Sequence, residues 1–274
     1  MNSLVRLFLC ACAFLFANSV LAISFGEPDN NEHPHVGTLL YVQNGVGFYS
    51  CTGTLLSPTV MLTAGHCVEE SGNVNDVTYV RFDEDALEGI DEFATLSDWF
   101  ADRWIEATQV IPHPDYDDYS AFPETFDVGL VILSEPVFVS TYGVLPDEGM
   151  LEAIKAQKGN KDNWFINVGY GSFGVNLPFV GDTSAYGRYK SITRLIELNG
   201  ANNGSDSSAK FSNNPGAGRG GTCFGDSGGP VFYQDTPIIT AVVSFGYTPC
   251  IGNDYQFRID TPTALDFILP YLAP

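Results

Sequence analysis

Three short segments of this chain hold residue types that could together carry out acyl transfer. His66 stands in the segment LTAGHC, Asp127 opens the apolar segment DVGLVIL, and Ser227 stands in GDSGGP. Acyl transfer needs a nucleophile, a base that takes its proton, and an acid that orients the base. Each residue alone would suit a plain structural role, such as a strand cap or a turn. Their combination points to catalysis.

Glycines flank the candidate nucleophile on both sides. Gly225, Gly228 and Gly229 allow the backbone to present N–H groups beside the Ser227 hydroxyl. An oxyanion developing during acyl transfer requires donors placed in this way. The segment could also be merely a turn.

The elements that must position these residues look like short strands. Gly and Pro, at 28 and 16 residues, bound segments rich in β-branched and aromatic residues. We therefore predict an all-β protein, built as two packed barrels or one large sandwich. Helical periodicity is clear only at 261–272, where Thr261 precedes a proline, and weaker at 93–103 and 150–158. The predicted strands are 36–42, 53–56, 60–62, 77–82, 128–133, 163–169, 238–245 and 257–259.

Charge and composition exclude several classes of protein. Lys and Arg number 12 against 33 Asp and Glu, so the formal net charge is −21. That charge argues against nucleic acid and anionic membranes as partners, because both need a basic surface. A hydrophobic share of 45% and an aromatic share of 13% exclude a disordered acidic chain.

Residues 1–22 have the pattern of a secretory signal peptide. A single cation, Arg6, precedes an apolar run, and the small residue Ala22 ends the segment. A buried helix or a membrane anchor is the alternative, but the run is short for a span of about 20 residues. We expect a secreted, extracellular protein whose mature chain begins at Ile23.

Four cysteines remain after the leader, namely Cys51, Cys67, Cys223 and Cys250. An even number in an exported chain predicts two disulfides, for which three pairings are possible. A zinc site is the competing interpretation, but the spacings do not fit a paired-cysteine ribbon. We expect no metal and no cofactor.

Together the TAGHC and GDSGGP motifs, in this order, resemble the trypsin/chymotrypsin-like serine protease family. The resemblance runs from Ile23 to the C-terminus. It implies two antiparallel six-stranded β-barrels with the active site between them, followed by a C-terminal helix. We accordingly expect an N-terminal barrel over 23–140 and a C-terminal barrel with the helix over 141–274.

The resemblance also assigns roles to the three candidate residues. His66 would act as general base and then acid, Asp127 would orient it, and Ser227 would be the nucleophile. The backbone N–H groups of Gly225 and Ser227 would form the oxyanion hole. The implied disulfides are Cys51–Cys67 and Cys223–Cys250. The partners would be protein or peptide substrates, and we expect a monomer.

The segment Ser244-Phe245-Gly246 resembles the strand along which substrates of this family pair. The resemblance implies a hydrogen bond from Ser244 to Asp127, and substrate pairing with the backbone of Ser244 and Gly246. Family members that cleave after Lys or Arg usually have an aspartate at the pocket floor, where this chain has Gly221. We therefore expect a non-tryptic preference at P1, the substrate residue before the cleaved bond.

One acidic residue complicates that expectation. Asp254 aligns near the back wall of the pocket, where an inward carboxylate would restore a partner for a basic P1 side chain. We expect Asp254 to be a solvated turn residue, because an unpaired carboxylate in the pocket would be costly to desolvate. The acidic loop 83–92 could hold calcium, but a solvated loop is the expected state.

The chain start has a family counterpart as well. In the family, a newly cut Ile or Val amino group pairs with the aspartate before the nucleophile, and here that pair would be Ile23 and Asp226. Because Ile23 follows the predicted signal site directly, signal peptidase itself could create the activating terminus.

Two other functions compete with this interpretation. A catalytically inactive binding protein on a protease fold is the alternative function, although such proteins usually lack a catalytic residue. An esterase of the α/β-hydrolase type needs Gly-x-Ser-x-Gly and the order Ser…Asp…His, which this chain lacks.

Overall fold

The structure is a computed structural model of the chain. It describes residues 23–43, 46–68, 76–117, 124–157, 159, 163–172, 186–198, 207–214, 220–247 and 249–273. The predicted signal peptide lies outside the described residues.

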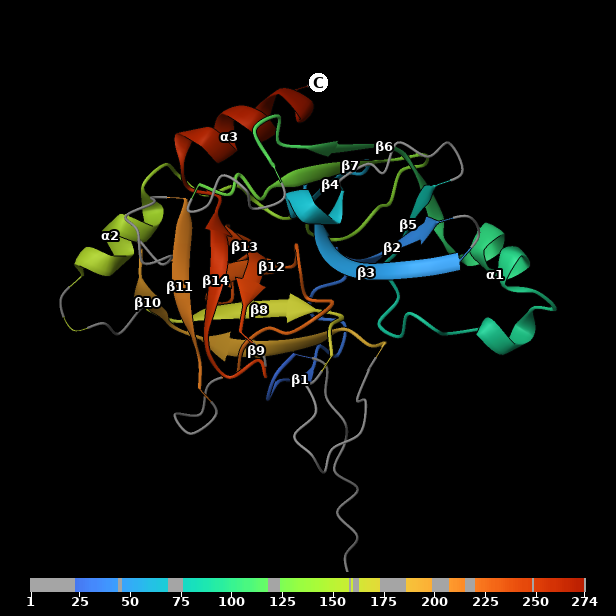
Figure 1. Ribbon diagram of the computed structural model, residues 1–274, viewed down its shortest axis with the longest axis horizontal. Coiled ribbons are helices and arrows are strands. Elements are labelled where there is room, and N and C mark those ends of the chain that lie inside the picture. Colours follow the sequence, from blue (N-terminus) through green and yellow to red (C-terminus); the bar gives the residue numbers. More distant parts are fainter. Residues whose placement is uncertain are drawn as a thin grey trace, which may run out of the picture.

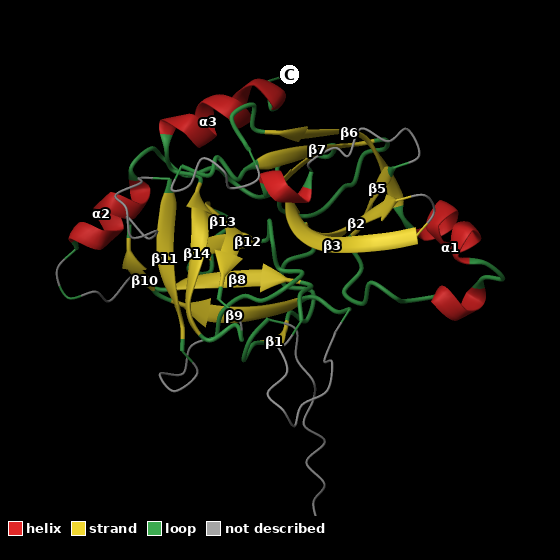
Figure 2. Ribbon diagram, in the orientation of Figure 1, coloured by secondary structure: helices red, strands yellow, loops and turns green. Residues whose placement is uncertain are grey.

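The first half of the chain forms a closed antiparallel barrel, as predicted. Its six strands follow the order β2-β3-β4-β7-β6-β5 and lie on the right in Figures 1 and 2. Apolar side chains such as Leu39, Leu55 and Met61 fill the interior. The strands are β2 (Val36–Gln43), β3 (Val46–Leu55), β4 (Val60–Thr63), β5 (Val77–Arg81), β6 (Ile105–Pro112) and β7 (Gly129–Leu133).

The second half is a curled sheet of eight strands in the order β1-β9-β8-β12-β13-β14-β11-β10. The all-β class is confirmed, but the described residues form this longer open sheet where a six-stranded barrel was expected. The difference arises because β1 adds to the edge at β9, and β10 pairs with β11. The strands are β1 (Glu27–Pro28), β8 (Phe165–Gly169), β9 (Tyr189–Thr193), β10 (Leu195–Glu197), β11 (Ser208–Asn213), β12 (Pro230–Tyr233), β13 (Ile239–Gly246) and β14 (Gly252–Arg258).

Three short α-helices lie outside the sheets. The C-terminal helix α3 (Pro262–Ile268) begins where predicted, because the Thr261 hydroxyl accepts a hydrogen bond from the Ala264 N–H. Thr95 caps α1 in the same way. The remaining helical elements are α1 (Leu96–Arg103), α2 (Met150–Ala156) and the 3₁₀ turns η1 (Gly65–Cys67), η2 (Ile90–Glu92) and η4 (Leu269–Tyr271).

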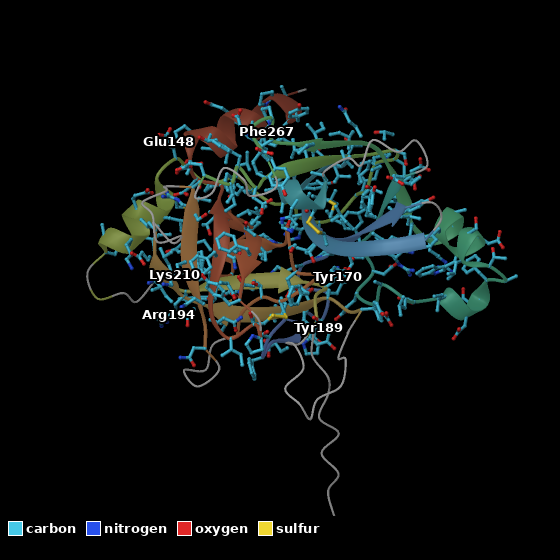
Figure 3. All side chains as sticks on the ribbon, viewed as in Figure 1. Glu148, Tyr170, Tyr189, Arg194, Lys210 and Phe267 are labelled. Atoms are coloured by element: carbon cyan, nitrogen blue, oxygen red, sulfur yellow. A yellow bond between two sulfur atoms is a disulfide. The ribbon has the colours of Figure 1, made fainter. Side chains whose placement is uncertain are left out.

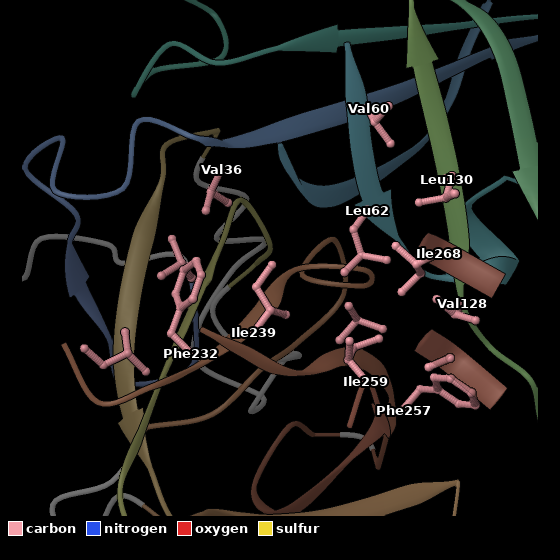
Figure 4. Packing of buried hydrophobic residues seen from close by; sticks show 14 of the residues in the cluster. Val36, Val60, Leu62, Val128, Leu130, Phe232, Ile239, Phe257, Ile259 and Ile268 are labelled. Carbon is pink, nitrogen blue, oxygen red and sulfur yellow. The ribbon is translucent and has the colours of Figure 1, made fainter. Parts of the chain in front are cut away.

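A shared apolar core joins the two halves. Figure 4 shows Leu62 and Leu130 of the barrel in one cluster with Phe232 and Ile239 of the sheet. Helix α3 comes from the C-terminal half but adds Ile268 to the same cluster. Burial of this cluster fixes the two sheets against each other, which an active site assembled from both requires.

The chain also crosses between the halves at its start, where β1 precedes the barrel but pairs with β9 of the second sheet. The domain division at residue 140 stays a prediction. Within the described ranges, no helix is long and apolar enough to cross a membrane.

Candidate active site

Two neighbouring barrel strands bring His66 and Asp127 together. Strand β4 pairs with β7 so that Thr63 lies opposite Gly129, and both candidates lie just beyond that pair. His66 is in the turn after β4, and its Nδ1 lies 3.0 and 2.9 Å from the two carboxylate oxygens of Asp127. The backbone N–H of His66 donates to Asp127 Oδ1 at 2.9 Å. The register of two strands therefore creates the predicted pair.

The Asp127 carboxylate is fully buried but well supplied with donors. Ser244 Oγ donates to Asp127 Oδ2 at 2.5 Å, which confirms the expected contact. Burial raises the pKa of Asp127, but the nearby His66 and the hydrogen bonds from His66 and Ser244 lower it further than burial raises it. Asp127 therefore stays ionised and can hold Nδ1–H of His66, which leaves Nε2 as the basic nitrogen.

The loop that carries Ser227 is docked onto the barrel by Thr52. The Thr52 N–H donates to the Ser227 carbonyl at 2.8 Å, and its hydroxyl donates to the Gly225 carbonyl at 2.9 Å. Gly228 has φ of +77°, and a Cβ there would lie 2.0 Å from Thr63 Oγ1. Only glycine fits this close approach, so the loop can reach the strands that hold His66.

The backbone of the same loop leaves the expected donors available. The N–H groups of Asp226 and Gly228 donate to backbone carbonyls. Among the described residues, the N–H groups of Gly225 and Ser227 are not engaged in such bonds. This arrangement fits an oxyanion hole, which needs donors free to turn toward a substrate.

His66 and Ser227 line one pocket of about 250 Å³. Ser244 and Gly246 also line it, as expected for a substrate-binding strand. Its other walls are neutral side chains, and none of the lining residues except His66 can carry a charge near neutral pH. The other lining residues are Thr222, Cys223, Phe224, Val243, Phe245, Tyr247 and Cys250.

Gly221, predicted near the pocket floor, is not among the residues that line this pocket. It packs against Asn213, where an added Cβ would lie 2.0 Å from the amide carbon, and its N–H donates to the Ser24 carbonyl. The neighbouring Thr222 does line the pocket. The assignment of Gly221 to the pocket floor stays a prediction.

The expectation that Asp254 is a solvated turn residue was wrong. It lies within strand β14 and is 1% exposed. Its Oδ1 accepts from the Asn213 amide at 3.0 Å, and its Oδ2 accepts from the Thr222 N–H at 2.6 Å. Burial raises the pKa of Asp254 to about 6, against the lowering effect of these hydrogen bonds. The carboxylate therefore supports the pocket wall from behind.

Asp226 is a second buried carboxylate next to the pocket. It accepts hydrogen bonds from the N–H groups of Gly171 and Cys223, both at 2.8 Å. Burial, helped by the nearby Asp254, raises the pKa of Asp226 to about 7 against the lowering effect of these two hydrogen bonds. Ile23 is also fully buried, and the adjacent Ser24 carbonyl is held by Gly221. The start of the predicted mature chain thus lies near the pocket segment.

Both expected disulfides are present, Cys51–Cys67 and Cys223–Cys250 (Figure 3). The donor atoms of Cys51, His66 and Cys67 lie within 4.8 Å of one another. Because both sulfur atoms belong to a disulfide, His66 is the one ligand available in this group. The first bridge therefore fixes the turn that carries His66.

A buried ionic network that the sequence analysis missed holds the N-terminal segment. The fully buried Arg188 donates to Asp29 Oδ2 at 2.9 Å, to the Phe82 carbonyl at 2.9 Å and to the Tyr170 hydroxyl at 3.0 Å. Burial raises the pKa of Asp29, but His33 and Arg188 lower it to about 2. The network connects the segment before β2 with both sheets. No sequence motif predicts it.

The family model for trypsin matches residues 23–268. The chain therefore belongs to the trypsin family, whose members are serine endopeptidases acting on proteins and peptides. This family match agrees with the closed barrel, the curled sheet and the pocket that contains His66 and Ser227.

Individual relatives are distant. The chain is 27% identical to Trypsin-10 of Gadus morhua over 73% of this chain and 72% of that protein. It is also 27% identical to the CLIP domain-containing serine protease B15 of Anopheles gambiae, over 83% of this chain and 63% of that protein. A solved structure of HL collagenase has a similar fold, with a TM-score of 0.68 and 17% identity over 91% of this chain and 98% of that chain.

Proposed function

We propose that this protein is a secreted, monomeric serine endopeptidase that cleaves peptide bonds through Ser227, His66 and Asp127. One observation carries the proposal. His66, which is hydrogen-bonded to Asp127, lines the same pocket as Ser227. A nucleophile, a base and an orienting carboxylate are the parts that acyl transfer needs.

The reaction follows from these positions. His66 Nε2 takes the Ser227 hydroxyl proton as Oγ attacks the substrate carbonyl carbon, and Asp127 stabilises the imidazolium that forms. The N–H groups of Gly225 and Ser227 hold the oxyanion. His66 then gives its proton to the leaving amine, and an acyl-enzyme remains. Water, activated by His66, releases the second product.

The pocket favours an apolar or aromatic side chain at P1. Its lining offers no carboxylate, and both oxygens of Asp254 are already bonded to Asn213 and Thr222. A Lys or Arg side chain in this pocket would lose water without gaining an ionic partner. Gly246, which bears no side chain, leaves the entrance open to a large group.

A profile of cleavage on a mixed peptide library tests both parts of this proposal. Cleavage should be lost in Ser227→Ala, with a fall in kcat/KM of about 10⁴-fold or more. In the active enzyme, apolar and aromatic P1 residues should dominate, and Asp254→Asn should leave Lys and Arg as poor substrates. Strong Lys or Arg cleavage that Asp254→Asn removes would instead assign the pocket to basic residues.

The N-terminus provides a separate test. We propose that removal of residues 1–22 frees the Ile23 amino group to pair with Asp226, whose carboxylate is buried beside two backbone donors. A mature chain that begins at Ile23 should be active, and a matched chain that keeps Ala22 should be much less active. Secreted protein should begin at Ile23 by intact-mass measurement. Equal activity of the two chains would contradict this activation route.

A different outcome would favour the alternative function. Protein that begins at Ile23, cleaves no peptide and does not react with a fluorophosphonate at Ser227 would be a binding protein on a protease fold.

A further inference from the structure

Gln256 occupies an unusual position between the specificity pocket and the candidate catalytic carboxylate. It lies in β14 with no exposed surface, two residues from Asp254 on the same face of the strand. Its side-chain amide touches two residues that line the pocket, Ser244 and Thr222. A buried amide in such a place needs partners for both its acceptor and its donor.

The first contact is at a bulge in the sheet. The pairing of β13 with β14 shifts between Val243 and Phe245, so that the ladder skips Ser244. The Ser244 N–H instead donates to Gln256 Oε1 at 3.1 Å. Because a backbone N–H can only donate, this contact fixes which way the Gln256 amide points.

The second contact follows from that orientation. With Oε1 toward Ser244, Gln256 Nε2 faces Thr222 and donates to its Oγ1 at 3.4 Å. Thr222 is also held through its N–H by Asp254. Two side chains of β14 that point to the same face, Asp254 and Gln256, therefore both hold Thr222 in the pocket wall.

The contacts form a continuous series from the pocket to the triad. Gln256 joins Thr222 to Ser244, whose hydroxyl donates to Asp127 Oδ2 at 2.5 Å. Asp127 in turn holds His66 Nδ1 at 2.9 Å. Catalytic geometry is sensitive to small displacements, and a misplacement of about 1 Å can cost about 100-fold in rate.

We propose that Gln256 is a positioning residue that couples the filling of the specificity pocket to the placement of Ser244 and Asp127. A P1 side chain that packs on Thr222 contacts a residue that Gln256 links to Ser244, and Ser244 orients the Asp127 carboxylate. The pocket thus contributes to kcat as well as to binding. This inference rests on the proposed endopeptidase activity.

The test compares substrates that differ only at P1, one with a large apolar residue and one with glycine. Gln256→Met keeps the length of the side chain and removes both hydrogen bonds. For the large P1 residue, kcat should fall about 10- to 100-fold, while KM changes little. For the glycine substrate, which leaves the pocket empty, kcat should fall much less.

Thr222→Val removes the hydrogen bond between Gln256 and Thr222 from the other side. It keeps the shape of Thr222 and its N–H contact with Asp254, but removes the hydroxyl, which contacts both Gln256 and Asp254. It should lower kcat with the same P1 dependence, and Thr222→Ser, which restores a hydroxyl, should recover most of the loss. The fold-loss of kcat in the double variant Gln256→Met with Thr222→Val should be smaller than the product of the two single losses, because both substitutions remove the bond between Gln256 and Thr222.

A matched control separates positioning from general destabilisation. Thr240 lies in the same strand as Ser244, and its buried hydroxyl donates to the Val231 carbonyl at 2.8 Å, outside the pocket. Thr240→Val should lower the melting temperature without changing the ratio of kcat between the two substrates.

The outcomes are distinct. An equal loss of kcat on both substrates, or losses that add in the double variant, would overturn the inference while leaving the proposed function intact. An inactive wild-type enzyme beginning at Ile23 would overturn the proposed function, and this inference with it.

Discussion

The two halves of the molecule position their catalytic groups by different means. The barrel is filled with apolar side chains and delivers His66 and Asp127 through the pairing of β4 with β7. The second sheet surrounds its pocket with buried polar groups, including Asp226, Asp254 and Gln256. Strand register is enough to place the base, whereas the pocket depends on a network of side-chain hydrogen bonds.

This difference has an energetic consequence. Apolar packing does not depend on pH or on precise orientation. A buried carboxylate, by contrast, lowers the stability of the fold unless hydrogen-bond donors satisfy it. Variants in the barrel interior should therefore change stability most. Variants in the polar layer of the second sheet should change activity, selectivity and pH dependence.

The largest expected effect comes from the point where the halves meet. Asp127→Asn keeps the shape of the side chain but removes the charge that orients His66, so kcat/KM should fall about 10⁴-fold. Ser244→Ala should cost far less, because His66 still holds Asp127. Initial rates on one peptide measure both variants. A loss of less than about 100-fold in Asp127→Asn would contradict the assigned role.

A core variant tests the barrel. Leu55→Ala removes a fully buried side chain and should lower the free energy of unfolding by about 2–5 kcal/mol. The P1 preference of the folded fraction should not change. Denaturant unfolding in a Ser227→Ala background avoids self-digestion. The exposed Leu269 provides the matched control, since Leu269→Ala should have little effect on stability. Equal effects of the two substitutions would contradict the description of the core.

The buried carboxylates predict a pH dependence. The pKa of Asp226 is raised by burial from 3.8 to about 7, so the folded chain binds its proton more tightly than the unfolded chain. Stability should therefore fall as the pH rises from about 4 to 7 in a chain that keeps residues before Ile23. Asp226→Asn should weaken this fall, leaving the contribution of Asp254.

Thermal unfolding of the Ser227→Ala chain across this pH range measures the effect. In a chain that begins at Ile23, the free amino group should supply a cation for Asp226 and reduce the loss at neutral pH. A fall in stability that Asp226→Asn leaves unchanged would assign the titration to other groups.

The smallest effect is expected at the surface of the barrel half. Arg103 donates to Glu92 at 2.8 Å, but both side chains are exposed, at 41% and 65%. Water and salt screen such a pair, so Glu92→Gln should change the free energy of unfolding by about 0.5 kcal/mol or less. The same unfolding measurement checks this value. A larger loss would mean that the α1 region contributes more to the barrel than its exposure suggests.

The sequence by itself predicted the all-β class, the C-terminal helix, the disulfide pairs and the expected catalytic residues. These features depend on local patterns, such as the glycines around Ser227, or on motifs that a family resemblance makes specific. The contact of Ser244 with Asp127 could be foreseen for the same reason. Each of these features can be stated without knowing the depth at which a residue lies.

Only the tertiary structure decided what surrounds the pocket. The sequence placed Asp254 near the pocket but could not decide its burial, and it gave no signal for Gln256, because an acidic or amide residue in a short strand is equally consistent with the surface. Burial depends on which segments contact the side chain. Here Asn213 of β11 contacts Asp254, and Thr222, in the segment before Ser227, contacts both Asp254 and Gln256. Burial of Arg188 was not predictable for the same reason, because its partners Asp29 and Phe82 lie more than 100 residues away in the sequence. Motifs therefore identified the chemistry, while the long-range packing of polar side chains set the character of the pocket.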